Sequence, residues 1–479
     1  MAILIYNTLT RRKEEFVPLE PGKVRFYLCG PTVYDYFHIG NARPFIVFDV
    51  YRRYLQYRGF DVTFVVNITD VDDKIINRAS REGRTPAEVA EEFTRAYFED
   101  IEKLRIRRAD VHPRATEHIQ EMIRMIEKLL ERGMAYCLNG DVYYNVEKFA
   151  EYGRLSGKNI EELQAGARIE VDERKRNPLD FALWKSAKPG EPMWDSPWGK
   201  GRPGWHIECS AMSTRYLGPD FDIHAGGEDL IFPHHENEIA QSCGAGSRYF
   251  ARYWMHNGFL NIRGEKMSKS LGNVLTVREI LKHYPAEVVR LFFLQKHYRS
   301  PINYSEEILE ETERAWRRLQ SVYEQLLELE EEPLEESALG AKERELLDRV
   351  RSLKTSFEAA MDDDFNSAQA IGHLFETNRL ANRLLSAETP NEGERRVLLE
   401  VRRIYEQFDG FLSLLRKEKI QETAGEDLSA VLELILEVRN ELRKRKLFDL
   451  ADKIREGLKE LGYAIEDKPD RSVWKKLNV

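Results

Sequence analysis

The sequence predicts an α/β protein in which a parallel-sheet domain carries an insertion and is followed by a helical bundle and a small C-terminal module. Three observations lead to this prediction. A strand, helix and strand pattern occupies residues 24–66, helical periodicity fills residues 306–416, and the last fifty residues combine two helical patterns with one strand pattern. A chain of 479 residues has room for about three or four domains with a core each.

The first element group is a βαβ unit made of an apolar strand, an amphipathic helix closed by Gly59, and a second apolar strand, at residues 24–29, 41–58 and 62–66. Its first turn reads HIGN, residues 38–41, at the helix N-terminus. Free N–H groups and the helix dipole favour a polyphosphate there, and Gly40 lets it approach the backbone. His38 can stabilise charge on a phosphate, and it can equally be a capping or packing residue. A Rossmann-like catalytic domain is therefore expected.

A second phosphate motif, KMSKS, occupies residues 266–270. Gly264 and Gly272 flank it, so Lys266 and Lys269 do not read as two charges on one helix face. Such a loop can close over ATP and supply positive charge to the transition state. The alternative interpretation is a solvated surface loop.

Metal-ligand candidates come from residues far apart in the sequence. The four cysteines include no CxxC pair, which argues against a zinc ribbon. His234 and Glu238 are four apart, and on a helix they would share one face. With Cys29 and Cys209 they give two thiolates, an imidazole and a carboxylate, a set that suits zinc. The cysteines can also be ordinary buried thiols, and His235 is a rival ligand.

Together HIGN and KMSKS are similar to the two signature sequences of class I aminoacyl-tRNA synthetases, with Asn41 where histidine is commoner. Asparagine still offers a hydrogen-bond donor to phosphate. Four further segments resemble the cysteinyl-tRNA synthetase family in the same order along the chain: CGPTVYD at 29–35, NITDVDDK at 67–74, GWHIECS at 204–210 and HAGGEDLIFPHHENE at 224–238.

The resemblance implies an ATP- and Mg²⁺-dependent ligase that activates L-cysteine and transfers it to tRNA(Cys). The implied catalytic residues are His38, Asn41, Lys266 and Lys269, and ATP binding adds Gly40 and Ser268. One Zn²⁺ held by Cys29, Cys209, His234 and Glu238 would select a thiol over the hydroxyl of serine, which shape alone separates by only ~1–3 kcal/mol. The implied substrate contacts are Thr32, Thr69, Trp205, Gly227 and Asp229, although Trp205 can be core and Asp229 a helix cap.

The resemblance and the composition shifts together predict the domain order. The split Rossmann-like domain is expected at 1–120 and 200–245, the connective insertion at 121–199, the KMSKS-bearing stem-contact region at 246–310, the helical bundle at 311–416, a polar linker at 417–427 and the anticodon-binding module at 428–479. Trp474 can stack on a base or belong to the small core.

Composition limits the class of protein. Hydrophobic residues make up 42% of the chain without an apolar run of about 18 residues, which excludes a transmembrane helix. Unpaired cysteines and the absence of a signal-peptide pattern predict a cytoplasmic protein, and we expect a monomer. The net charge of −9 does not exclude RNA binding, because a local basic face can hold phosphate. The basic run at residues 443–446 can be such a face or a solvated helix surface.

Two rival functions share these motifs. A cysteine ligase of the mycothiol type joins cysteine to an amino-sugar, and the roughly fifty residues after the linker argue against it. A non-catalytic zinc-dependent RNA-binding paralogue would be expected to lack His38 or Lys269, and this sequence has both.

Overall fold

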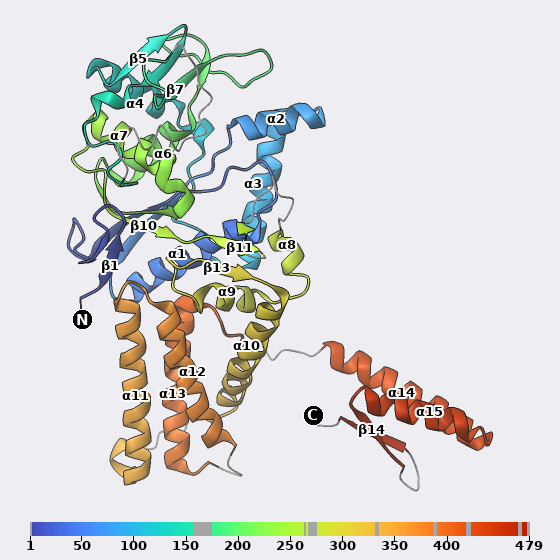
Figure 1. The fold of residues 1–479 in the computed structure, drawn as a ribbon. Coiled ribbons are helices and arrows are strands. Elements are labelled where there is room, and N and C mark those ends of the chain that lie inside the picture. The colour runs from blue at the N-terminus through green and yellow to red at the C-terminus, as the bar shows by residue number, and fades with distance from the viewer. Residues whose placement is uncertain are drawn as a thin grey trace. The chain divides into compact units, whose positions relative to one another are not determined.

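The computed structural model describes residues 2–157, 175–262, 265–266, 275–330, 335–386, 390–417, 423–467 and 472–476. It divides into two compact units, Met1–Leu415 and Arg416–Val479 (Figure 1). Each unit is described separately below.

A four-stranded parallel sheet forms the centre of the first unit. Its order is β10-β9-β3-β4, with bounds Ala251–Asn257, Phe221–Gly227, Lys23–Leu28 and Asp61–Val66. Helix α1 (Ile39–Tyr57) connects β3 to β4, which confirms the predicted βαβ unit and the α/β class. The strand order reverses between β3 and β9, where parallel sheets bind ligands beyond the carboxyl ends of their strands.

A second, antiparallel sheet lies between β4 and β9 in the sequence. Its strands run in the order β5-β6-β7-β8, with bounds Ala135–Leu138, Asp141–Tyr144, Phe181–Ser186 and Gly201–Pro203. The accompanying helices are α2 (Asp73–Glu82), α3 (Pro86–Lys103), α4 (Ile119–Glu131), α6 (Trp205–Leu217) and α7 (Glu236–Ala245). Met122 of α4, Trp184 of β7 and Met212 of α6 share one buried core. This core fixes α6 and α7 at the edge of the parallel sheet.

The N-terminal hairpin and a small three-stranded sheet complete the part of the first unit that carries the two larger sheets. The hairpin pairs β1 (Leu4–Asn7) with β2 (Arg12–Glu15) and lies against β10. The small sheet has the order β12-β11-β13, with bounds Glu265–Lys266, Leu260–Ile262 and Ile302–Tyr304. Helices α8 (Val277–Ile280) and α9 (Ala286–Leu294) follow β12.

The predicted helical bundle is confirmed. It comprises α10 (Glu306–Leu327), α11 (Ala341–Asp362), α12 (Ser367–Leu385) and α13 (Glu392–Leu412), which Figure 1 shows at the opposite end of the first unit from β5 and β7. Phe357 and Phe408 stack with ring centroids 3.8 Å apart. Arg53 of α1 donates to the Gly410 carbonyl at 2.6 Å and thereby joins the bundle to the βαβ unit.

The second unit contains α14 (Thr423–Lys444), α15 (Phe448–Glu460), and the antiparallel pair β14 (Tyr463–Asp467) and β15 (Ser472–Lys476). Trp474 packs against the core of this unit, with its ring 5.8 Å from that of Tyr463, as the core interpretation expects. The polar segment predicted as a linker, residues 417–427, is helical from Thr423 onward. Polar composition does not separate a linker from an exposed helical turn. Among the described residues, no helix is long and apolar enough to cross a membrane.

Candidate metal centre and active site

The candidate site lies at the carboxyl ends of β3 and β9, where the strand order of the parallel sheet reverses. Cys29 follows β3 directly, and its N–H donates to the Ala225 carbonyl of β9 at 3.1 Å. Helix α6 carries Cys209. The turn η4 (Ile231–His235) carries His234 and leads into α7, which carries Glu238. The topology therefore gathers residues that span more than two hundred positions in the sequence.

The four predicted metal ligands lie together. The ligand atoms of Cys29, Cys209, His234 and Glu238 are all within 4.8 Å of one another, and all four residues are buried. The two Sγ atoms are 3.8 Å apart, and the Cys29 Sγ is 3.6 Å from the Glu238 Oε1. The His234 Nε2 lies 3.1 Å from the same oxygen. A tetrahedron with Zn–S bonds of about 2.3 Å would place its two sulfurs about 3.8 Å apart.

A second group of ligand-type atoms overlaps the first. Cys29, His224, His235 and Glu238 also lie within 4.8 Å of one another. The His235 Nε2 is 3.2 Å from the Cys29 Sγ, and the His224 Nε2 is 2.9 Å from the Glu238 Oε2. The sequence leaves open whether His234 or His235 is the ligand. In the structure each of these histidines belongs to a different group of possible ligands, and the two groups share Cys29 and Glu238.

Because the cluster is buried, the charged forms of its thiol, carboxyl and imidazole groups are unfavourable without a metal ion. Burial raises the pKa of the Cys29 thiol and of the Glu238 carboxyl well above their usual ranges. It also lowers the pKa of His234 well below its usual range. A divalent cation reverses this preference, because it stabilises thiolate and carboxylate and binds a neutral imidazole. Two sulfurs, one nitrogen and one oxygen in a dry pocket fit zinc better than magnesium or calcium.

Trp205 forms one wall of the cluster. Its ring stacks on the His234 imidazole with centroids 4.2 Å apart and planes inclined by 24°. The side chain is 37% exposed, so Trp205 is not an ordinary core residue and keeps a surface toward solvent. His206 also contacts His234, with the two Nδ1 atoms 2.9 Å apart. Burial lowers the pKa of His206 to about 3, so this ring is a neutral hydrogen-bonding partner.

Thr32 and Thr69 lie beside each other in a parallel bridge next to Cys29. The Thr69 N–H donates to the Pro31 carbonyl, and the Val33 N–H donates to the Thr69 carbonyl, each at 3.1 Å. The Thr69 hydroxyl donates to Glu208 Oε2 at 3.0 Å. Thr69 therefore links residues 31–33, which follow Cys29, to Glu208 of α6. Thr32 is only half-buried.

At the nucleotide end, His38 is the N-cap of α1. Its Nδ1 accepts the Asn41 N–H at 3.1 Å, so the capping interpretation is correct. Because Nδ1 is an acceptor, the proton of the neutral ring is on Nε2. The cap thus sets a tautomer that can donate a hydrogen bond from Nε2. Gly40 is half-buried and Asn41 is exposed at this helix start.

The downstream phosphate motif is tied to the same turn. The Ile39 N–H donates to the Leu275 carbonyl and the Val277 N–H donates to the Phe37 carbonyl, both at 2.9 Å. At the other end, Lys266 pairs with Asn261 in the β11–β12 ladder. Ser268 and Lys269 lie outside the described residues. Lys266, the first residue of the motif, is therefore held in the small sheet, and residues 275–277, beyond the motif, are held to the His38 turn.

Gly227 and Asp229 lie at the end of β9. Gly227 is the last residue of the strand, and Asp229 is exposed in the short helix η3 (Glu228–Leu230). The N-cap of η3 is Gly227, without a side-chain cap hydrogen bond, so Asp229 is not the helix cap that the sequence allowed.

Comparison with known proteins gives the family. The class I (C) catalytic domain of tRNA synthetases matches residues 15–314, and the DALR domain matches residues 356–416. The chain is 51% identical over 473 residues to the cysteine–tRNA ligase of Carboxydothermus hydrogenoformans, covering 99% of this chain and 100% of that protein. It is 52% identical over 480 residues to that of Thermococcus onnurineus, covering 100% of both. The chain belongs to the cysteine–tRNA ligase family.

The fold agrees with this class I family. Methionyl-tRNA synthetase of Mycobacterium tuberculosis, solved in complex with methionyl-adenylate, superposes with a TM-score of 0.63. The match covers 85% of this chain and 93% of that chain at 17% sequence identity, so it speaks for the fold alone. A putative arginyl-tRNA synthetase from Campylobacter jejuni gives a TM-score of 0.52 at 13% identity.

Two residues of this ligase-family site were missed in the sequence. The Asn67 Oδ1 accepts the Gly30 N–H at 2.7 Å and lies 3.7 Å from the Cys209 Sγ. Glu208 is fully buried beside Cys209 and accepts from Thr69. A signal existed for Asn67, because it follows an apolar parallel strand, β4, at the same edge of the sheet as Cys29. Only the packing of α6 reveals Glu208.

Proposed function

We propose that this protein activates L-cysteine with ATP and transfers the cysteinyl group to the 3′-terminal adenosine of tRNA(Cys). The observation that carries the proposal is the buried cluster of two thiols, an imidazole and a carboxyl, at the sheet edge where His38 begins α1. A thiol-selective cluster beside a nucleotide-binding helix start is what activation of cysteine requires. Family membership supports the same reaction.

In the activation step, a cysteine carboxylate oxygen attacks the α-phosphorus of ATP and pyrophosphate leaves. The His38 Nε2–H and the amide of Asn41 would donate hydrogen bonds to the phosphate oxygens as charge develops. Lys266 and Lys269 would add positive charge from the KMSKS segment. Residues 275–277, which follow that segment in the sequence, are hydrogen-bonded to the His38 turn. Magnesium would accompany the ATP. In the transfer step, a ribose hydroxyl attacks the cysteinyl carbonyl and AMP leaves.

Cys29, Cys209, His234 and Glu238 would hold one zinc ion. When bound, zinc supplies a soft acceptor that prefers the thiolate of cysteine to the hydroxyl of serine. Trp205, stacked on His234, would cover the side chain of the amino acid. The exposed Asp229 and the half-buried Gly227 and Thr32 would then contact the adenylate and the amino-acid backbone.

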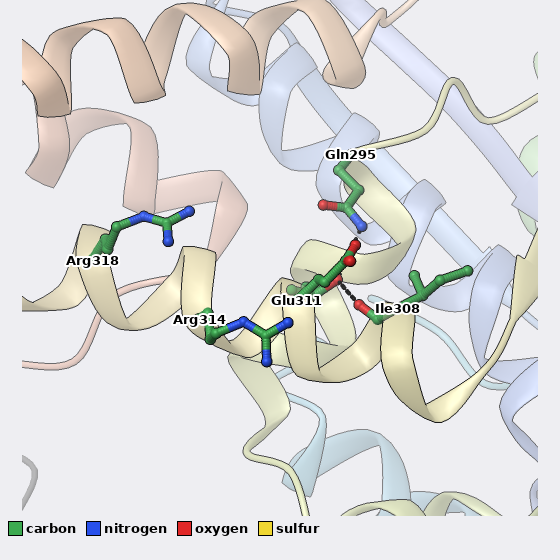
Figure 2. Close-up of a pocket in the computed structure, with 6 residues that line it drawn as sticks. Gln295, Ile308, Glu311, Arg314 and Arg318 are labelled. Carbon is green, nitrogen blue, oxygen red and sulfur yellow. Dashed lines mark hydrogen bonds between the residues drawn. The ribbon is translucent and has the colours of Figure 1, made fainter. Parts of the chain in front are cut away.

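An arginine-lined groove on the bundle suits the phosphate backbone of tRNA. Three cavities of 440, 620 and 590 Å³ follow one another along α10, α11 and α12, the first two sharing Arg318 and the last two sharing Arg379. Figure 2 shows Arg314 and Arg318 on successive turns of α10 at the first cavity. Further arginines of the groove are Arg317, Arg349 and Arg383. We propose that the bundle and the C-terminal module, residues 311–416 and 428–479, bind tRNA, while residues 1–310 carry the chemistry.

The test for the groove is a double variant, Arg318→Ala with Arg379→Ala. Its KM for tRNA should rise, and the slope of log affinity against log salt should fall by about one for each phosphate that the variant no longer neutralises. The KM for cysteine in pyrophosphate exchange should stay unchanged. Arg95→Ala, on the exposed face of α3, is the matched control. An unchanged salt slope would remove the groove from the tRNA site.

The decisive assay for the reaction is transfer of labelled cysteine into acid-precipitable tRNA, with ATP–pyrophosphate exchange in parallel. Cys209→Ser should lose both zinc and cysteine activation. Cys243→Ser, a half-buried cysteine outside the cluster, should keep both. Exchange without label in tRNA would point to another acceptor such as an amino-sugar. Retention of zinc and of exchange by Cys209→Ser would overturn the ligand assignment.

A further inference from the structure

Thr8, half-buried in the N-terminal hairpin, begins a line of polar groups that ends at the metal cluster. The Thr8 Oγ1 lies 2.8 Å from the His256 Nδ1, and the His256 Nε2 lies 2.8 Å from the His235 Nδ1. The His235 Nε2 lies 3.2 Å from the Cys29 Sγ. The two histidines are buried, at 5% and 0% exposure, so water does not satisfy their nitrogens.

We propose that Thr8, His256 and His235 form a one-way hydrogen-bond chain that ends by donating to the Cys29 thiolate, and that Thr8 is a positioning residue of the metal cluster. The inference rests on the proposed zinc site. It also answers the question of the rival ligand. In this chain His235 is a donor to Cys29, so its Nε2 carries a proton and does not bind the metal.

The direction of the chain follows from the atoms at its end. A metal-bound thiolate has no proton to give, so the His235 Nε2–H must donate to the Cys29 Sγ. The His235 Nδ1 is then an acceptor and takes the His256 Nε2–H. The His256 Nδ1 in turn accepts from the Thr8 hydroxyl. Each nitrogen is used once, and both rings hold the same neutral tautomer.

The opposite direction makes His235 a ligand, with Nδ1–H donors pointing toward Thr8. The composition of the two groups argues against it. The group that contains His235 lacks Cys209, so it offers one sulfur where the group with His234 offers two, and a second thiolate favours zinc. The 3.8 Å between the sulfurs of Cys29 and Cys209 matches two ligands of one tetrahedral zinc. The separation of 3.2 Å between the Cys29 Sγ and the His235 Nε2 is within reach of an N–H···S hydrogen bond.

The hairpin that supplies Thr8 is held firmly against β10, beside which it lies in Figure 1. The Thr8 N–H donates to the Trp254 carbonyl at 2.9 Å, and the Trp254 N–H donates to the Asn7 Oδ1 at 3.1 Å. These bonds hold Thr8 against Trp254, two residues before His256 along β10. Residues 4–14 of the hairpin precede the catalytic-domain match, which begins at residue 15, so Thr8 lies outside the matched residues.

The test compares Thr8→Val, which keeps the shape and removes the hydroxyl, with Thr8→Ser, which restores it. Thr10→Val, an exposed threonine of the same hairpin, is the matched control. Zinc affinity is measured by competition with a chelator, and Co²⁺ is titrated into the zinc-free full-length protein to follow its thiolate charge-transfer and d–d bands. ¹⁵N-histidine NMR of the zinc-loaded protein reports the tautomers.

We expect Thr8→Val to weaken zinc binding about tenfold and to alter the Co²⁺ spectrum, as loss of outer-shell partners does, with Thr8→Ser close to wild type. His235 and His256 should both show Nε2–H signals in wild type. Equal zinc affinity of Thr8→Val and Thr10→Val, or a metal-bound Nε2 on His235, would overturn the proposed hydrogen-bond chain without contradicting the zinc site. Failure of wild type to bind either metal would overturn the zinc site and the chain with it.

Discussion

Arg43 is expected to join the two phosphate-binding motifs, and its replacement by methionine tests this. Arg43 lies two residues after the HIGN turn and is fully buried. Its guanidinium donates to the carbonyls of Phe259 and Tyr298 at 3.0 Å each, to that of Ser300 at 2.6 Å, and to that of Gly258. These carbonyls lie on both sides of the KMSKS segment in the sequence. One side chain therefore holds residues 258–259 and 298–300 to α1.

The magnitude follows from the partners that remain. The Tyr298 carbonyl keeps the Gly258 N–H at 2.9 Å, and the Phe259 carbonyl keeps the Ile302 N–H at 3.0 Å. The Gly258 carbonyl keeps the side-chain amide of Asn257 at 3.1 Å. Only the Ser300 carbonyl then loses its donor without replacement, and a hydrogen bond to a charged donor is worth ~1.5–3 kcal/mol. Relief of the buried charge offsets part of this cost, since burial lowers the pKa of Arg43 to about 10. Arg43→Met should lower the free energy of unfolding of the first unit by about 1.5–3 kcal/mol.

The assay is urea unfolding followed by tryptophan fluorescence, together with ATP–pyrophosphate exchange under conditions where the variant is fully folded. Exchange should fall although the cysteine cluster is untouched, because residues 258–259 and 298–300, between which the KMSKS segment lies in the sequence, lose their hydrogen bonds to α1. Arg43→Lys should be intermediate, since a lysine cannot span four carbonyls. Arg95→Met, at an exposed position of α3, should stay within ~0.5 kcal/mol of wild type. A change of less than ~1 kcal/mol for Arg43→Met, with normal exchange, would refute this reasoning.

Three further predictions concern other parts of the first unit. Burial lowers the pKa of His112 to about 4, and its Nδ1 donates to the Val66 carbonyl while its Nε2 accepts the Ala109 N–H. In the unfolded chain the imidazole of His112 is protonated below about pH 6.5, whereas in the folded protein it stays neutral down to about pH 4. The contribution of neutral His112 to the free energy of unfolding should therefore be fully present above pH 6.5 and fall by roughly 3 kcal/mol toward pH 4. The urea midpoint of His112→Gln should depend less steeply on pH than that of wild type. A Cβ at Gly30 would lie 1.6 Å from the Asn67 carbonyl oxygen. Gly30→Ala should therefore lower the free energy of unfolding by about 3 kcal/mol and bind less zinc. The control is Gly372→Ala in α12, where a Cβ would have nothing within 4 Å; this variant should be neutral or stabilising. Lys269→Ala should lower the kcat of pyrophosphate exchange more than it changes the KM for cysteine, and an unchanged kcat would remove Lys269 from the transition state.

The local elements could be predicted from the sequence because they depend on near neighbours. The apolar strands around residues 24–29 and 62–66 and the helix between them follow from periodicity, and His38 at a helix start follows from its position. The spacing of His234 and Glu238 also predicted correctly that their side chains are neighbours, although His234 lies in the turn η4 and not in a regular helix. The polar segment 417–427 follows the boundary between the two units at Leu415, but polar composition did not show that α14 begins within it, at Thr423.

The tertiary structure decided which distant residues meet. Cys29 and Cys209 are 180 positions apart, and only the strand order and the packing of α6 bring their sulfurs to 3.8 Å. The sequence left Trp205 as a substrate contact or a core residue, and its stacking on His234 depends on where α6 lies against η4. Thr8 gives no signal of its own, since its role exists only through His256 and His235. Residue types and local periodicity thus determined the elements and the chemistry at hand, while the partners of each side chain depended on long-range packing, which no local pattern encodes.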